Sequence, residues 1–162
     1  MKKKQVIKAG LIGALWGHAL HSYFLMSRSL TIGVRAIVRS SDGKFLLVKH
    51  SYTPGWHLPG GGVEKGETAE NALRHELRQE TGLNIIGRPE LHGLHYNSGV
   101  SKRDHVLTYI CTTDGEVVEN FATLEIIEVG YFGIDDLPAD LDPGTGRRIQ
   151  EIVENLEPQA VW

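Results

Sequence analysis

The feature that most constrains this chain is a run of three glycines directly ahead of a segment rich in glutamate and leucine, LPGGGVEKGETAENALRHELRQETGL at residues 58–83. Glycine adopts backbone dihedrals that other residues avoid, so Gly60 to Gly62 predict a tight loop that brings main-chain carbonyls close to a ligand. Thr68 is placed to cap the segment that follows, and residues 68–80 are predicted to form a helix. The sequence therefore predicts a glycine loop that leads directly into a helix.

Two glutamates share the apolar side of this predicted helix. At about 100° per residue, Glu80 lies about 40° from Glu76, and Leu73 and Leu77 lie on the same half, whereas the arginines point to the far side. A carboxylate beside a buried stripe protonates, finds a cationic partner or binds a metal. No lysine or arginine lies on this side of the helix, and Mg²⁺ takes carboxylate and carbonyl oxygens. Taken singly, however, a glycine triplet is usually a turn, and paired helical glutamates usually face solvent.

The composition is that of a single globular domain without a strong charge bias. The chain has 162 residues and a formal net charge of -3 at pH 7. This charge excludes a broad basic surface, so no stable nucleic-acid binding is expected. A phosphate-bearing partner would instead be held by a local feature such as a bound metal ion. Cys111 is the only cysteine and lies in an apolar run. It indicates a buried small side chain and a reducing, cytoplasmic location.

Short β-rich runs fill the chain from residue 31 onward. Residues 31–38 and 44–49 flank an Asp42-Gly43 turn signal and are predicted to form two antiparallel strands. Further strands are predicted at 85–97, 105–113 and 126–134. After Pro143-Gly144 a closing amphipathic helix is marked by Ile149, Ile152, Val153 and Leu156. Because strands do not alternate strictly with helices, this order predicts an α/β fold with a mixed sheet between helical layers.

Residues 1–28 are predicted to form an N-terminal helical extension to a main domain at residues 29–162. Four apolar residues recur there at a spacing of four and predict one stripe of a helix: Ile12, Trp16, Leu20 and Phe24. The opening lysines and the apolar run resemble a signal peptide, but Lys8 interrupts the run, which is too short to span a bilayer. We favour a helix packed on its own domain or on a second copy, which would make a homodimer, over a membrane anchor.

Taken together, the glycine loop and the helix resemble the signature of the Nudix hydrolases. That signature is Gly, five residues, Glu, seven residues, then Arg-Glu-aliphatic-x-Glu-Glu-x-Gly-aliphatic. The matching residues in this chain are Gly61, Glu67, Glu76, Leu77, Glu80, Gly82 and Leu83. The resemblance implies a three-layer α/β/α sandwich with a mixed β-sheet from about residue 31 onward, with the N-terminal helix as an addition.

Two positions depart from that signature. His75 stands where the family has arginine, and Gln79 stands where it has the first glutamate of a pair. In the family this arginine pairs with the glutamate matched by Glu67 and holds the loop against the helix, a part that a histidine imitates only when protonated. The rigidity of the loop is therefore expected to depend on pH. Gly61, His75 and Gly82 are accordingly assigned structural or orienting roles.

The resemblance implies a metal-dependent hydrolase that cleaves a diphosphate linkage in a nucleoside diphosphate derivative, of nucleotide-sugar, ADP-ribose or nucleoside triphosphate type. The expected cofactor is Mg²⁺ or Mn²⁺, held by Glu76, Glu80 and the Gly60 carbonyl. Gln79 can offer a neutral oxygen to a metal or to its water. A small-molecule partner follows from the same resemblance.

Hydrolysis also needs a general base. The family often uses a glutamate from the loop before the last core strand, and its spacing from Tyr131 favours Glu125 over Glu128. A glutamate of the signature itself, such as Glu67, stays an alternative. Both Glu125 and Glu128 are also consistent with ordinary surface glutamates at a strand edge.

Two segments of the sequence are predicted to contact the substrate. Trp56 and His57 precede the glycine loop, and Tyr96 and Arg103 flank a polar loop. Stacking on a base and cationic contacts to phosphate suit these side chains. An ordinary polar loop with a half-buried aromatic residue suits them equally. A Nudix-like module that binds a nucleotide or a protein without turnover is the alternative function, and His75 and Gln79 favour it.

Overall fold

The computed structural model describes residues 29–117 and 123–162. The chain divides into two units, Met1–Leu30 and Thr31–Trp162, and the second contains all the elements named below. The predicted N-terminal helical extension lies outside the described residues. Within the described ranges, no helix is long and apolar enough to cross a membrane.

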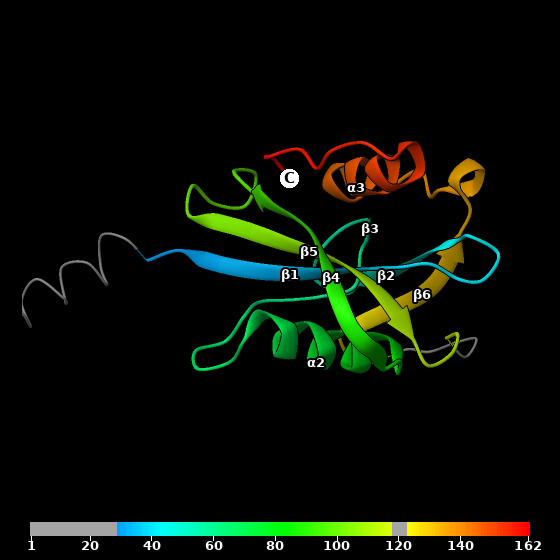
Figure 1. Cartoon of the computed structure of the whole chain (residues 1–162), viewed down its shortest axis with the longest axis horizontal. Coiled ribbons are helices and arrows are strands. Elements are labelled where there is room, and N and C mark those ends of the chain that lie inside the picture. The colour runs from blue at the N-terminus through cyan, green and yellow to red at the C-terminus, as the bar shows by residue number, and fades with distance from the viewer. Residues whose placement is uncertain (1–28, 118–122) are drawn as a thin grey trace, which may run out of the picture. The chain divides into compact units, whose positions relative to one another are not determined.

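Two three-stranded sheets form the middle of the second unit (Figure 1). Their strands are β1 (Thr31–Val38), β2 (Phe45–His50), β3 (Trp56–His57), β4 (Ile85–Tyr96), β5 (Asp104–Thr113) and β6 (Ile126–Phe132). The first sheet has the order β1-β5-β4, with β1 parallel and β4 antiparallel to β5. The second has the order β3-β2-β6 and is antiparallel throughout. The first sheet is therefore mixed, as the sequence predicts.

One helix covers each side of the strands. In Figure 1, α2 (Ala69–Thr81) lies on one side and α3 (Pro143–Glu154) on the other, and a short 3-10 turn, η1 (Ile134–Asp136), precedes α3. The side chains of β1 alternate between the two layers, because successive residues of a strand point to opposite faces. Val34 belongs to the core cluster of α2, whereas Ile37 packs in the cluster of α3. The three-layer α/β/α sandwich is thereby confirmed.

Local sequence signals place most element boundaries within one or two residues. The helix predicted at 68–80 is observed as α2, and the Thr68 side chain accepts a hydrogen bond of 3.1 Å from the Asn71 N–H as its N-cap. Pro143 opens α3, where its missing N–H costs nothing. Cys111 is 6% exposed and free within the α2-side core, as predicted.

The predicted pairing of β1 with β2 is wrong. The Asp42-Gly43 turn is present, but the strands separate after a single bridge between Arg39 and Phe45 and enter different sheets. One edge of β1 pairs with β5 along its whole length, and the other accepts the glycine loop. No edge of β1 is left for β2, and a sequence-local hairpin signal cannot report such competition from distant segments.

Candidate active site

Helix α2 carries the two predicted metal ligands on its buried side. Leu73 and Leu77 are fully buried, Glu80 is 6% exposed and Glu76 is half-buried, as the helical pattern predicts. The helix ends at Gly82, whose φ of 76° lies in the left-handed region that favours glycine. Gly82 therefore ends the helix six residues after Glu76 and two residues after Glu80.

The glycine loop runs alongside β1 as a further extended segment. The N–H groups of Val34 and Ala36 donate to the carbonyls of Gly61 and Pro59, each at 2.8 Å. Gly60 has φ of 139°, and a Cβ atom there would lie 2.1 Å from the Val34 carbonyl oxygen. Only glycine fits this position, because both the dihedral and the space exclude a side chain.

The two carboxylates of α2 converge on this loop. A Cβ atom at Gly61 would lie 2.6 Å from the Glu76 carboxyl group, so the main chain approaches that carboxylate closely. The Gly60 N–H donates to Glu80 Oε2 at 2.7 Å. Glycine at both positions therefore lets the loop meet the acidic side of the helix.

Burial raises the pKa of both carboxyl groups. The pKa of Glu80 is raised from 4.5 to about 7, chiefly by burial, although the Gly60 N–H and the nearby Arg35 act to lower it. Burial also raises the pKa of Glu76, against the influence of His75 and Arg35. Desolvation penalises the charged form, so these groups would gain from a bound cation.

His50 lies beside Glu80 but does not neutralise it. Its Nε2 is 3.4 Å from Glu80 Oε1, and the residue is 5% exposed. Burial, together with Arg35 and His57, lowers the pKa of His50 from 6.5 to about 4. At neutral pH this histidine is therefore uncharged. Neither of its ring nitrogens has a hydrogen-bond partner among the described residues.

A divalent cation fits this set of donors. In residues 29–117 and 123–162, no group of three or more His, Cys, Asp or Glu side chains is arranged to hold a metal. A cation held by Glu76 and Glu80 would take its other ligands from a main-chain carbonyl, water and substrate phosphates. Mg²⁺ is commonly held in this way, by one or two carboxylates.

Known proteins resemble this chain over most of its length. The NUDIX domain family matches residues 29–152. The chain belongs to this family. It is 35% identical over 100 residues to an ADP-ribose pyrophosphatase of Methanocaldococcus jannaschii, over 60% of this chain and 59% of that protein. It is 46% identical over 54 residues to a putative 8-oxo-dGTP diphosphatase of Bacillus subtilis, over 33% of this chain and 36% of that one. The chain thus spans only part of the length of either relative.

A solved structure supports the Nudix assignment over a larger share of the chain than either of these two relatives. The crystal structure of a MutT NUDIX hydrolase from Burkholderia pseudomallei superposes with a TM-score of 0.63 at 28% identity. The match covers 76% of this chain and 98% of that chain. The sandwich described above is therefore the Nudix fold.

The two departures from the Nudix signature contact each other. His75 Nε2 lies 2.9 Å from Gln79 Nε2, one turn along the exposed side of α2. Glu67 Oε1 instead accepts the N–H of Glu64 at 2.6 Å, within the turn ahead of the helix. Among the described residues, no ion pair joins His75 to Glu67.

The two candidate bases lie in different places. Glu125 is exposed and lines a 360 Å³ pocket together with Gln79 and Glu80. Glu128 pairs in register with Lys49. Phe45 and Leu47 of β2 belong to the α3-side cluster, and Lys49 is the next residue on the same face of that strand. Its partner Glu128 on β6 therefore also faces the α3 side. Glu125 thus shares the site with the α2 carboxylates, whereas Glu128 lies on the opposite face of the sheet.

The predicted substrate contacts are not brought together. Trp56 is 5% exposed and packs edge-on against Phe132 in the core. His57 is half-buried and lines a 480 Å³ pocket on the α3 side, and its ring lies 5.9 Å from that of His50. Tyr96 lies against the His105 ring at 5.4 Å, and neither it nor Arg103 lines this pocket.

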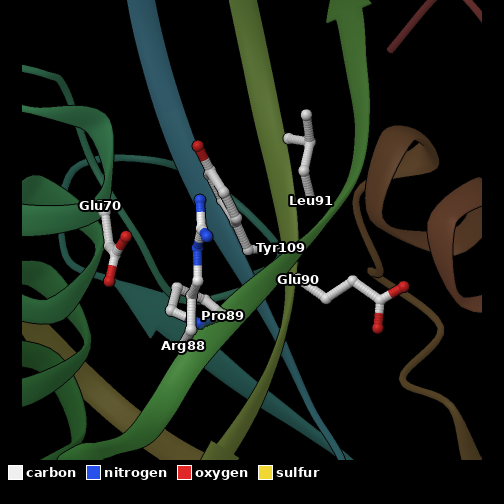
Figure 2. A pocket seen from close by; sticks show the side chains of 6 residues that line it. All are labelled: Glu70, Arg88, Pro89, Glu90, Leu91 and Tyr109. Carbon is white, nitrogen blue, oxygen red and sulfur yellow. The ribbon is translucent and has the colours of Figure 1, made fainter.

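A separate hollow of 490 Å³ lies between the start of α2 and the first sheet (Figure 2). Figure 2 shows Glu70 reaching it from α2, while Arg88 and Tyr109 come from β4 and β5. None of the predicted site residues lines this hollow. It is therefore distinct from the cluster at Glu76 and Glu80.

Sequence reasoning missed the two residues that β1 and β2 bring to the site. Arg35 Nη1 donates to the carbonyls of Leu58 and Gly60, and His50 lies beside Glu80. Arg35 is the only charged residue within TIGVRAIV. A lone arginine inside a buried strand signals that its guanidinium has acceptors nearby. His50 carries no comparable signal in the sequence.

Proposed function

We propose that this Nudix chain hydrolyses a diphosphate linkage in a nucleoside diphosphate derivative with the help of Mg²⁺ or Mn²⁺. The observation that carries the proposal is the convergence of the Glu76 and Glu80 carboxylates on the Gly60-Gly61 loop. The family supports a nucleotide pyrophosphohydrolase, and the relatives named above are a pyrophosphatase and a diphosphatase of nucleotides. ADP-ribose and an oxidised nucleoside triphosphate are therefore the first substrates to test.

Each residue of the cluster has a distinct part in this proposal. Glu76, Glu80 and the Gly60 carbonyl hold the cation, and Gln79 offers a neutral oxygen beside it. When bound, the cation neutralises phosphate charge and makes water a better nucleophile. The Gly60 N–H keeps Glu80 aimed at the loop.

Glu125 is the preferred general base. Glu125 is exposed and lines the same pocket as Glu80, so it can reach water there. Glu128 faces the other side of the sheet, and Glu67 Oε1 accepts the Glu64 N–H within the turn ahead of the helix. A base must lie within hydrogen-bond reach of the proton that it removes.

The test is release of phosphate-bearing products from ADP-ribose, nucleotide sugars and nucleoside triphosphates, with Mg²⁺, with Mn²⁺ and with a chelator. Glu80→Gln is expected to lower turnover at least about 100-fold, because it removes a charge that acts on the reacting phosphate. Glu70→Gln is the matched control on the same helix, since Glu70 pairs with Arg74 away from the cluster. Nucleotide binding without turnover in wild type would contradict the hydrolase and favour the binding module.

A further inference from the structure

We propose that Arg35 is a positioning residue for the metal-binding loop, holding the Gly60 carbonyl from the β1 side. This deepens the function proposed above and, where it concerns the cation, rests on it. Arg35 contacts neither carboxylate through a hydrogen bond, so it acts through the loop rather than on the reaction itself.

The carbonyls of the loop alternate in direction, and Arg35 serves one of the two sets. Those of Pro59 and Gly61 accept main-chain N–H groups of β1. Those of Leu58 and Gly60 both accept from Arg35 Nη1, at 2.9 and 2.6 Å. The arginine therefore completes the pairing of four consecutive carbonyls with β1.

No other described residue donates to the carbonyls of Leu58 or Gly60. Both residues are buried, whereas Arg35 is half-buried and lines the 480 Å³ pocket on the α3 side. A buried acceptor without a donor is costly, and the loop would shift to relieve it. Removing the guanidinium thus frees the segment that carries the proposed metal ligand.

Gly60 is held from two directions at once. Its N–H donates to Glu80 of α2, and its carbonyl accepts from Arg35 of β1. A carbonyl oxygen has two lone pairs, so one stays available for a cation. Partners that orient a metal ligand are typically worth about 10- to 100-fold in metal affinity.

The positive charge of Arg35 acts in the opposite sense. It is among the influences that lower the pKa of Glu80 and Glu76, after burial, which raises both. Like charges repel, so a guanidinium near a cation site weakens cation binding by charge alone. The two effects on Mn²⁺ affinity therefore have opposite signs, and a substitution separates them.

Arg35→Met removes the donors and the charge at similar length, whereas Arg35→Lys keeps one nitrogen able to donate to both carbonyls. The matched control is Arg39→Met, directly after the end of β1, because Arg39 donates to the Gly43 carbonyl in the distant turn. For each full-length variant, amide hydrogen exchange at Gly60, the Kd for Mn²⁺, kcat and KM are measured, with thermal unfolding to establish that the chain is folded.

If Arg35 positions the loop, Arg35→Met should speed amide exchange at Gly60 at least 10-fold and weaken Mn²⁺ binding about 10-fold or more. Arg35→Lys should recover part of both effects. Arg39→Met should change neither the exchange rate nor the Mn²⁺ affinity. Tighter Mn²⁺ binding in Arg35→Met would overturn the proposal in favour of charge repulsion. A rise in KM alone, with exchange unchanged, would overturn it in favour of direct substrate contact. Because the exchange measurement needs neither metal nor turnover, it judges the Arg35 contact even if the hydrolase proposal fails.

Discussion

At Glu80, burial and the proposed function act in opposite directions. Burial raises its pKa to about 7, yet metal binding requires the ionised carboxylate. The neighbouring His50 cannot offset the charge, because burial lowers its pKa to about 4. The site is thus a place where stability is given up for a charge that acts on a ligand.

The first prediction concerns the stability of the metal-free protein with pH. Because the folded pKa of Glu80 lies above 4.5, the folded state keeps its proton longer than the unfolded state. This contribution is complete below pH 4.5 and is lost as the pH rises through 7, by at most about 3 kcal/mol. Glu80→Gln should therefore gain stability relative to wild type between pH 5 and pH 8, as measured by thermal unfolding with a chelator.

Glu80→Gln can also change the free energy of unfolding by an amount that does not depend on pH. Comparing the difference between the variant and wild type at pH 5 and at pH 8 removes this constant amount. Parallel stability profiles for wild type and Glu80→Gln would show that Glu80 ionises normally in the folded chain. The buried environment assigned to this carboxylate would then be wrong.

At the scale of the element, the loop and α2 work as one unit because glycine allows close approach. A Cβ at Gly61 would meet the Glu76 carboxyl at 2.6 Å, and that carboxyl is the end of a flexible side chain. Gly61→Ala is therefore expected to displace the carboxylate rather than break the fold. Displacements of about 1 Å at a reacting site cost up to about 100-fold in rate.

The loop supplies its own control for this prediction. A Cβ at Gly62 would have nothing within 4 Å, so Gly62→Ala should leave turnover close to wild type. Gly61→Ala should lower kcat at least 10-fold while the free energy of unfolding changes by less than about 1 kcal/mol. Equal kcat in the two variants would show that the contact between loop and helix does not position Glu76.

The elements themselves are predictable where the signal is local. Capping by Thr68, the apolar period of α2 and the turn at Asp42-Gly43 each depend on neighbours within a few residues. The pairing of β1 depends instead on β5 and on the glycine loop, which compete for its edges. Local patterns therefore fix strands but not their partners.

At the scale of the whole molecule, α3 shows a second limit of pattern reasoning. Of the predicted apolar stripe, Ile149 and Ile152 pack in the α3-side cluster, whereas Val153 and Leu156 are 45% and 48% exposed. The buried side also contains Arg148, which binds Glu151 through two hydrogen bonds of 2.8 and 2.6 Å. His92 of β4 completes this pair at 2.9 Å from the same carboxylate. A hydropathy pattern assigns charged residues to the exposed side of a helix, so it cannot predict a buried ion pair.

The residues of the site also differ in whether a local pattern could predict them. Glu76 and Glu80 were predictable because the helical period alone places them beside Leu73 and Leu77. Arg35 was not assigned, because its acceptors lie more than twenty residues further along the chain. The homodimer and the cytoplasmic location stay predictions.

The central claim is that the Gly60-Gly61 loop and the α2 carboxylates together hold a divalent cation. It is tested most directly by adding Mn²⁺ to the ¹⁵N-labelled protein and recording which amide signals broaden. We expect Gly60 and Gly61 to broaden first, at less than one equivalent, and to stay sharp in Glu76→Gln. Sharp loop signals in wild type, with broadening at surface acids such as Asp135 and Asp136, would contradict the account.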